Sequence, residues 1–109
     1  MDTSALPEVS TALLDEARGH SARRAARTLY GGSGHALRQT AIALLAGSTL
    51  SDHENPGEAT LQVLVGQVRL SWSDGAVDLD AGGHVVIPQE RHGLLAVTDA
   101  VVLLTAAKT

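Results

Sequence analysis

Residues 47–66 read GSTLSDHENPGEATLQVLVG, and this stretch decides the fold. Its Pro-Gly pair at positions 56–57 predicts a turn, because proline fixes its own backbone and glycine accepts conformations that other residues avoid. After that turn, residues 59–65 are mostly apolar and stop at Gly66, which is typical of a β-strand. We therefore expect a turn between strands here, with His53 just before the turn.

The same alternation of short apolar runs and turn residues continues on both sides of this stretch. Further strands are predicted at residues 23–30, 37–46, 68–72, 76–79, 84–87, 94–97 and 101–106. Ser73-Asp74-Gly75 predicts a tight hairpin turn between two of them. Eight to ten strands at this spacing predict a mainly β protein, either a sandwich or a small barrel.

Residues 4–18 instead follow the periodicity of an amphipathic helix. The apolar stripe consists of Leu6, Val9, Leu13 and Ala17. We expect Ser4 to cap the start of this helix, Pro7 to be tolerated in its first turn and Gly19 to end it.

A second stretch, residues 82–92, reads GGHVVIPQERH. Together the two stretches resemble the paired motifs of the cupin superfamily, except that His92 comes one position earlier than the second motif requires. The segments 27–32, 37–40 and 59–64 are also similar to small, single-domain, RmlC-like cupins of actinobacteria, most of which have no assigned function. The resemblance implies a single-domain cupin jelly-roll β-barrel over residues 21–109, with one short N-terminal α-helix in residues 1–20 as part of the same domain.

A full cupin site holds a divalent metal with three histidines and one glutamate, ligands that suit several transition metals. Here Asn55 stands at the position of the second histidine, and Ala59 stands at the position of the glutamate. The resemblance therefore implies a degraded site in which His53, His92 and Asn55 hold Zn, Fe, Mn or Ni weakly. The alternative is that His53 and His92 are neutral, hydrogen-bonded histidines of the core.

The barrel interior is also the expected ligand pocket. Its polar lining is predicted to be His53, Asn55, His92, Gln39 and Gln62. For the two glutamines the two-residue period of a strand leaves open whether they line the pocket or face solvent. His20 and His84 are expected at the surface. Because leucine and valine supply nearly all other large side chains, the pocket suits a small, largely apolar molecule.

Two classes of function remain open. One is a binding module that holds a small molecule. The other is an enzyme in which His53 and His92, with or without a metal, act as acid and base or as ligands in an isomerisation, a cyclisation or an oxygenation. Residue types exclude other chemistries, because residues 31–34 lack the lysine of a phosphate-binding loop and the chain has no cysteine nucleophile.

Composition limits the remaining possibilities. The chain has 109 residues, of which 44% are hydrophobic and 18% are charged, values typical of one folded domain. The absence of cysteine excludes disulfides, so we expect a cytoplasmic protein. Apolar runs are far shorter than the roughly 20 residues needed to cross a bilayer, so no membrane partner is expected.

Charge is unevenly distributed along the chain. Residues 17–51 contain five arginines and no acid, whereas residues 52–109 contain eight acids and three bases. The five are Arg18, Arg23, Arg24, Arg27 and Arg38. Nucleic-acid binders usually add aromatic platforms or a high isoelectric point, and aromatic residues make up 2% of this chain, so no nucleic-acid partner is expected. We expect the arginines to pair with acids across strands or across the interface of a homodimer.

Overall fold

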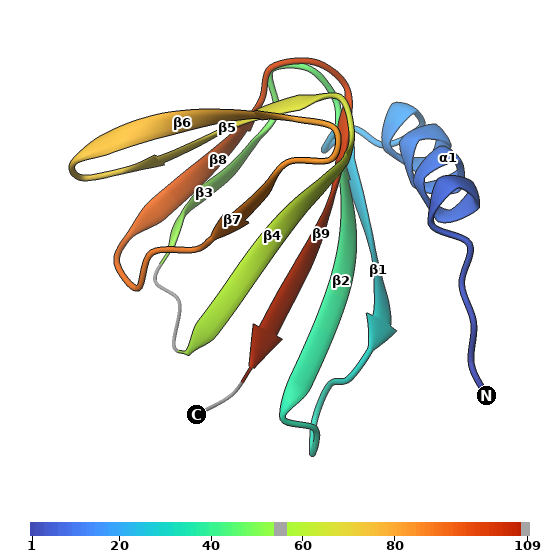
Figure 1. Ribbon diagram of the computed structural model, residues 1–109. Helices are drawn as coiled ribbons and strands as arrows, with labels where there is room; N and C mark the ends of the chain where they lie inside the picture. The colour runs from blue at the N-terminus through green and yellow to red at the C-terminus, as the bar shows by residue number, and fades with distance from the viewer. Residues whose placement is uncertain (54–56, 108–109) are drawn as a thin grey trace.

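The computed structural model consists of two antiparallel β-sheets with one helix beside them (Figure 1). It describes the backbone of residues 1–53 and 57–107, and the side chains of all of these except residues 51–53. The five-stranded sheet has the strand order β1-β2-β9-β4-β7, and the four-stranded sheet has the order β3-β8-β5-β6. This arrangement is a jelly-roll sandwich, and it confirms the predicted mainly β fold with one N-terminal helix.

The strands fall close to the predicted segments. The strands of the five-stranded sheet are β1 (Arg24–Tyr30), β2 (Leu37–Leu44), β4 (Glu58–Val65), β7 (His84–Val86) and β9 (Ala100–Ala107). Those of the four-stranded sheet are β3 (Thr49–His53), β5 (Gln67–Trp72), β6 (Gly75–Asp80) and β8 (His92–Ala96). The sequence of β3, TLSDH, has a single large apolar residue, so its own pattern does not predict a strand. A strand was expected here only from the resemblance to cupins.

The main core lies between the two sheets. Each strand turns alternate residues toward the opposite sheet, and we call this side of each sheet its inner face. The buried inner-face residues are Leu44, Ala59, Leu61, Val63, Val68, Leu70, Ile87, Leu94, Ala96, Ala100 and Val102. No hydrogen-bonded pairing joins the two sheets among the described residues, so the sheets are not closed into a barrel.

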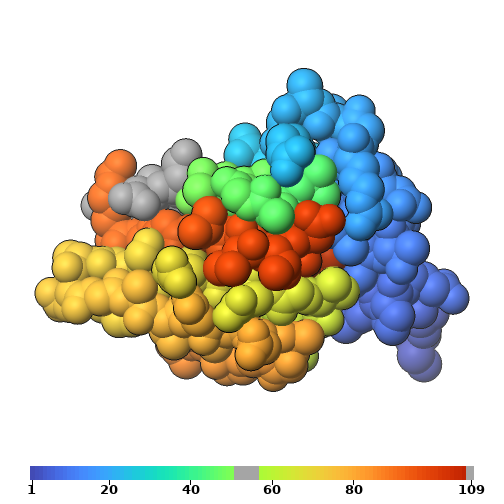
Figure 2. All heavy atoms as spheres, turned by 90° about the horizontal axis from the view of Figure 1, so that it is seen from above, coloured from blue at the N-terminus to red at the C-terminus, as the bar shows by residue number. Residues whose placement is uncertain are grey.

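Helix α1 (Leu6–Arg18) covers part of the outer face of the five-stranded sheet. Its predicted stripe is confirmed, because Val9, Leu13 and Ala17 are buried against that sheet. Figure 2 shows the helix along one flank of the molecule. The expected cap at Ser4 is wrong: the N-cap residue is Ala5, one position later, and it makes no side-chain capping hydrogen bond. Gly19 ends the helix as predicted.

The two ends of the sandwich differ. At the end near helix α1 the strands converge, whereas at the other end they spread apart (Figure 1). We call these the closed end and the open end. At the closed end Gly66 has a φ of 79°, and a Cβ there would lie 2.1 Å from the carbonyl oxygen of Asp99, so only glycine fits. The open end holds the connections β1–β2, β3–β4 and β7–β8 and the last residues of β9.

No helix in the described part of the chain is long and apolar enough to cross a membrane.

Candidate functional site

His92 has a polar side chain that is buried between the two sheets. In the part of the chain that the structure describes, no other polar side chain is buried there. His92 begins β8 at the open end, and its side chain is 5% exposed. Leu94 and Ala96 follow at two-residue spacing and belong to the core between the sheets, so His92 shares their inner face. The other buried polar residue, Ser10, lies in helix α1 and donates its hydroxyl hydrogen bond to Leu6.

The imidazole of His92 is held from the β7–β8 connection. Its Nδ1–H donates to the backbone carbonyl oxygen of Glu90, 2.9 Å away. The side chain of Glu90 in turn accepts a hydrogen bond of 2.6 Å from the hydroxyl of Ser73, in the β5–β6 turn. Because a carbonyl oxygen can only accept, the proton of this bond lies on Nδ1. The loop therefore fixes both the position and the orientation of the ring.

The strands on both sides of β8 place further residues next to His92. Trp72 lies opposite it in β5, and its indole is half-buried. His53 lies opposite it in β3, which is the pairing that the two sequence motifs imply. For His53 only the backbone is described, and Asn55 lies outside the described residues.

The described side chains supply too few ligands for a metal. Among them, no group of three or more His, Cys, Asp and Glu lies close enough to hold an ion. Ala59, at the position of the cupin glutamate, is 6% exposed and packs into the core between the sheets. Its methyl group cannot bind a metal, so His92 is the one described side chain that fits a metal site at this position.

The two glutamines do not share the inner face with His92. In β4, Gln62 is exposed between the buried Leu61 and Val63, so it projects from the outer face of the five-stranded sheet. Gln39 is also on the outer face, where its amide nitrogen donates to the hydroxyl of Thr105 at 3.2 Å. Of the two alternatives that the sequence left open, the structure therefore places both residues away from the space between the sheets.

A depression of about 470 Å³ lies on the outer face at the open end. Thr60, Val86, Gln89 and Thr105 are part of its lining, and Glu58 supplies its one charged group among the described residues. Most of its strand residues lie on the outer face, but Ala59 and Ile87, which belong to the core between the sheets, also line it. His92 is not part of its lining.

Sequence reasoning missed three polar residues on the inner face at the open end. Arg38 and Thr40 of β2 precede the inward-facing Ile42 and Leu44 at two-residue spacing, and Thr28 of β1 is paired directly with Thr40. We call Thr28, Arg38 and Thr40 the polar corner. The two-residue period of β2 contained this signal, because it places Arg38 and Thr40 on the same face as the two apolar residues.

Solved structures identify the architecture. No family model matches the sequence, and no curated protein matches it. A conserved protein of unknown function from Streptococcus pyogenes superposes with a TM-score of 0.73 at 25% identity, covering 83% of this chain and 78% of that one. An RmlC-like cupin from Desulfovibrio desulfuricans gives 0.67 at 26% identity, over 77% and 81% of the two chains. A cupin superfamily protein from Desulfitobacterium hafniense gives 0.73 at 15% identity, over 79% and 78%. The chain has the cupin fold.

Within this cupin fold the two motif stretches lie side by side in space. Residues 47–66 form β3 and β4, and residues 82–92 form β7 and the start of β8. β3 pairs with β8 in one sheet, and β4 pairs with β7 in the other. The motif positions of this cupin therefore lie on both sheets at the open end, with His92 and Ala59 on the two inner faces.

Proposed function

We propose that this cupin binds a small, largely apolar molecule between its two sheets at the open end, next to His92. The observation that carries the proposal is the burial of His92 on an inner face whose other buried residues are all aliphatic. A pocket of this kind, apolar with a single oriented polar group, is typical of sites for small organic molecules. Ala59, in place of a metal-binding glutamate, adds to the apolar surface there.

The proposal is tested with two neutral probes, benzamide and hexanamide. Trp72 is the single tryptophan of the chain and lies opposite His92 in the β5–β8 pair, so its fluorescence reports on this site. We expect a saturable change in Trp72 fluorescence with either probe and a matching binding isotherm by calorimetry. His92→Ala should weaken binding about fivefold to tenfold, because the amide loses its hydrogen-bonding partner.

The matched control is His84→Ala, because His84 is exposed and pairs with Gln62, which lies on the outer face. This variant should bind both probes like the parent protein. If neither probe binds at millimolar concentration, or if His92→Ala binds as well as the parent, the site is not between the sheets.

A second candidate function is a metal-dependent or histidine-dependent enzyme of the isomerase, cyclase or oxygenase type. The direct pairing of His53 with His92 across β3 and β8 favours it. In this proposal His53, His92 and Asn55 hold a divalent metal weakly, with water completing its coordination. Metal analysis of protein purified without a histidine tag tests it: the parent should contain substoichiometric metal that His53→Ala removes and His20→Ala retains. A parent protein that takes up no Zn²⁺ or Ni²⁺ by calorimetry contradicts it.

A further inference from the structure

We infer that the ligand of this cupin carries a carboxylate, and that Arg38 of the polar corner binds it. The inference rests on the proposed function and narrows it from a small apolar molecule to a small organic acid. It begins with the three polar residues on the inner face of β1 and β2 at the open end, namely Thr28, Arg38 and Thr40.

The strand registers place Arg38 within reach of the site around His92. Arg38 pairs with Ala106 of β9, and Ala106 pairs with Ala59 of β4. Neighbouring strands lie about 4.8 Å apart, so the Cα atoms of Arg38 and Ala59 are separated by about 10 Å. Ala59 marks the motif position that faces the site. An arginine side chain spans much of that separation, so a molecule of a few carbon atoms can touch both.

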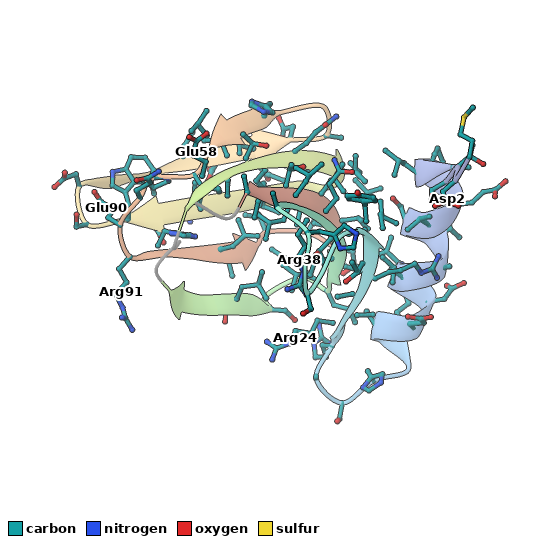
Figure 3. All side chains as sticks on the ribbon, turned by 90° about the horizontal axis from the view of Figure 1, so that it is seen from below. Asp2, Arg24, Arg38, Glu58, Glu90 and Arg91 are labelled. Carbon is teal, nitrogen blue, oxygen red and sulfur yellow. The ribbon has the colours of Figure 1, made fainter. Side chains whose placement is uncertain are left out.

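The polar corner matches the chemistry of a carboxylate. Thr28 and Thr40 are directly paired, and Arg38 is two residues from Thr40 on the same face. A guanidinium group forms paired hydrogen bonds with a carboxylate, and the adjacent threonine hydroxyls are further donors. Ala106, Ala59 and the core beyond them form an apolar surface for the rest of the molecule. In Figure 3 Arg38 lies at the open end, between β2 and β3.

Arg38 differs from Arg18, Arg23 and Arg24 of the basic segment, because no described ion pair or hydrogen bond engages its guanidinium group. Arg18 forms ion pairs with Asp15 and with Asp99, which confirms in this one case the predicted pairing with acids. Arg23 and Arg24 donate to the backbone carbonyls of Ala46 and Thr49. Among the side chains that the structure describes, which exclude those of residues 51–56, no ion pair engages Arg38.

Two other arginines, Arg27 and Arg91, have neither a described ion pair nor a described hydrogen bond, and they point elsewhere. Arg27 pairs with Ala41, which packs under helix α1, so Arg27 lies on the outer face. Arg91 projects away from the body of the molecule (Figure 3). Arg38 is therefore an arginine at an inner-face position, exposed at the open end, with no ion pair among the described side chains.

Matched pairs of probes test the inference, namely benzoate against benzamide and hexanoate against hexanamide. We expect the parent protein to bind each acid at least tenfold more tightly than its amide, by Trp72 fluorescence and by calorimetry. Arg38→Ala should abolish that preference, so that each acid binds no more tightly than its amide. Arg38→Lys, which keeps the charge but loses the paired geometry, should retain about a third of the affinity for the acids.

Arg27→Ala is the control, because it removes an arginine of the same segment from the opposite face of the sheet. It should keep the preference for acids. Equal binding of acid and amide by the parent protein overturns the carboxylate inference while the proposed function stands. An acid preference that survives Arg38→Ala also overturns it. If all four probes fail to bind, the proposed function fails first, and this inference fails with it.

Discussion

Replacing Ala59 with glutamate restores the carboxylate that the cupin motif normally has and tests where residue 59 lies. Ala59 is 6% exposed and packs into the core between the sheets. A carboxylate in this position loses most of its hydration and has no described cationic partner, and an uncompensated buried charge costs several kcal/mol. We expect Ala59→Glu to lower the free energy of unfolding at pH 7 by about 3 to 5 kcal/mol, measured by urea denaturation followed by circular dichroism.

The pH dependence of this loss follows from the same burial. Burial raises the pKa of the introduced carboxyl in the folded state above its unfolded value of about 4.3. Below the unfolded pKa both states are protonated, so only the cost of the added volume remains. As pH rises above that value, the unfolded state releases its proton first, and stability falls by about 1.4 kcal/mol per pH unit until the folded pKa is reached.

Thr60→Glu is the matched control, because Thr60 is the next residue of β4 and lies on the outer face. We expect it to cost less than about 1 kcal/mol, with no such pH dependence. Added Zn²⁺ should restore stability to Ala59→Glu alone, because the new carboxylate would join His92 as a metal ligand. Equal losses of stability in the two variants would refute the placement of residue 59 between the sheets.

Four further predictions follow from the described contacts. Leu13→Ala should lower the free energy of unfolding by about 2 to 5 kcal/mol in urea denaturation, because Leu13 of helix α1 is 0% exposed where the helix packs on the sheet, and a loss below about 1 kcal/mol would mean that the helix is not docked. The hydrogen bond from Arg69 lowers the pKa of Asp78, so Arg69→Ala should raise the pKa of Asp78 in an NMR titration. The contribution of this pair to stability is present above the unfolded pKa of Asp78 and is lost as pH falls through its folded pKa. Thr40→Val should raise the melting temperature by a few degrees, because it adds apolar contact where no described hydrogen bond is lost, and it should weaken benzoate binding about twofold. The protein should form a homodimer, because β1 and β7 leave the outer edges of the five-stranded sheet unpaired, and a monomer mass by light scattering at micromolar concentration would contradict this.

Most of the secondary structure could be predicted because its signals are local. Gly or Pro residues flank β2, β4 and β7 on both sides and Gly31 follows β1, and the spacing of Val9 and Leu13 identified the helix. β3 has no comparable signal in its own residues, because Thr49–His53 contains one large apolar side chain, Leu50. Its pairing with β8 comes from residues about 40 positions away in the sequence, which no local pattern reports.

Local sequence signals predicted only part of the candidate site, because the rest depends on packing between distant strands. The resemblance to cupins predicted that His53 and His92 lie on different strands, and the structure pairs the backbones of these two residues across β3 and β8. It could not indicate which face of β2 and β4 is inner, because both faces are apolar where helix α1 covers the outer one. Gln39 and Arg38 are adjacent in one strand, and only the packing of the second sheet decides that Arg38 is the residue facing inward.

The polar groups of the inner face lie mainly at the open end, and this distribution favours a binding site there. At the closed end Leu44, Val63 and Val68 are 0% exposed, and they pack against aliphatic neighbours as folding alone requires. At the open end the same face carries a buried imidazole and the polar corner. His92 is 5% exposed, so an aliphatic side chain in its place would extend the core and contribute more to stability, since a buried polar group gains little even when it is hydrogen-bonded. Folding alone therefore does not account for the buried imidazole, whereas binding of a small organic acid, with its apolar body beside His92 and its carboxylate at Arg38, accounts for both the imidazole and the polar corner.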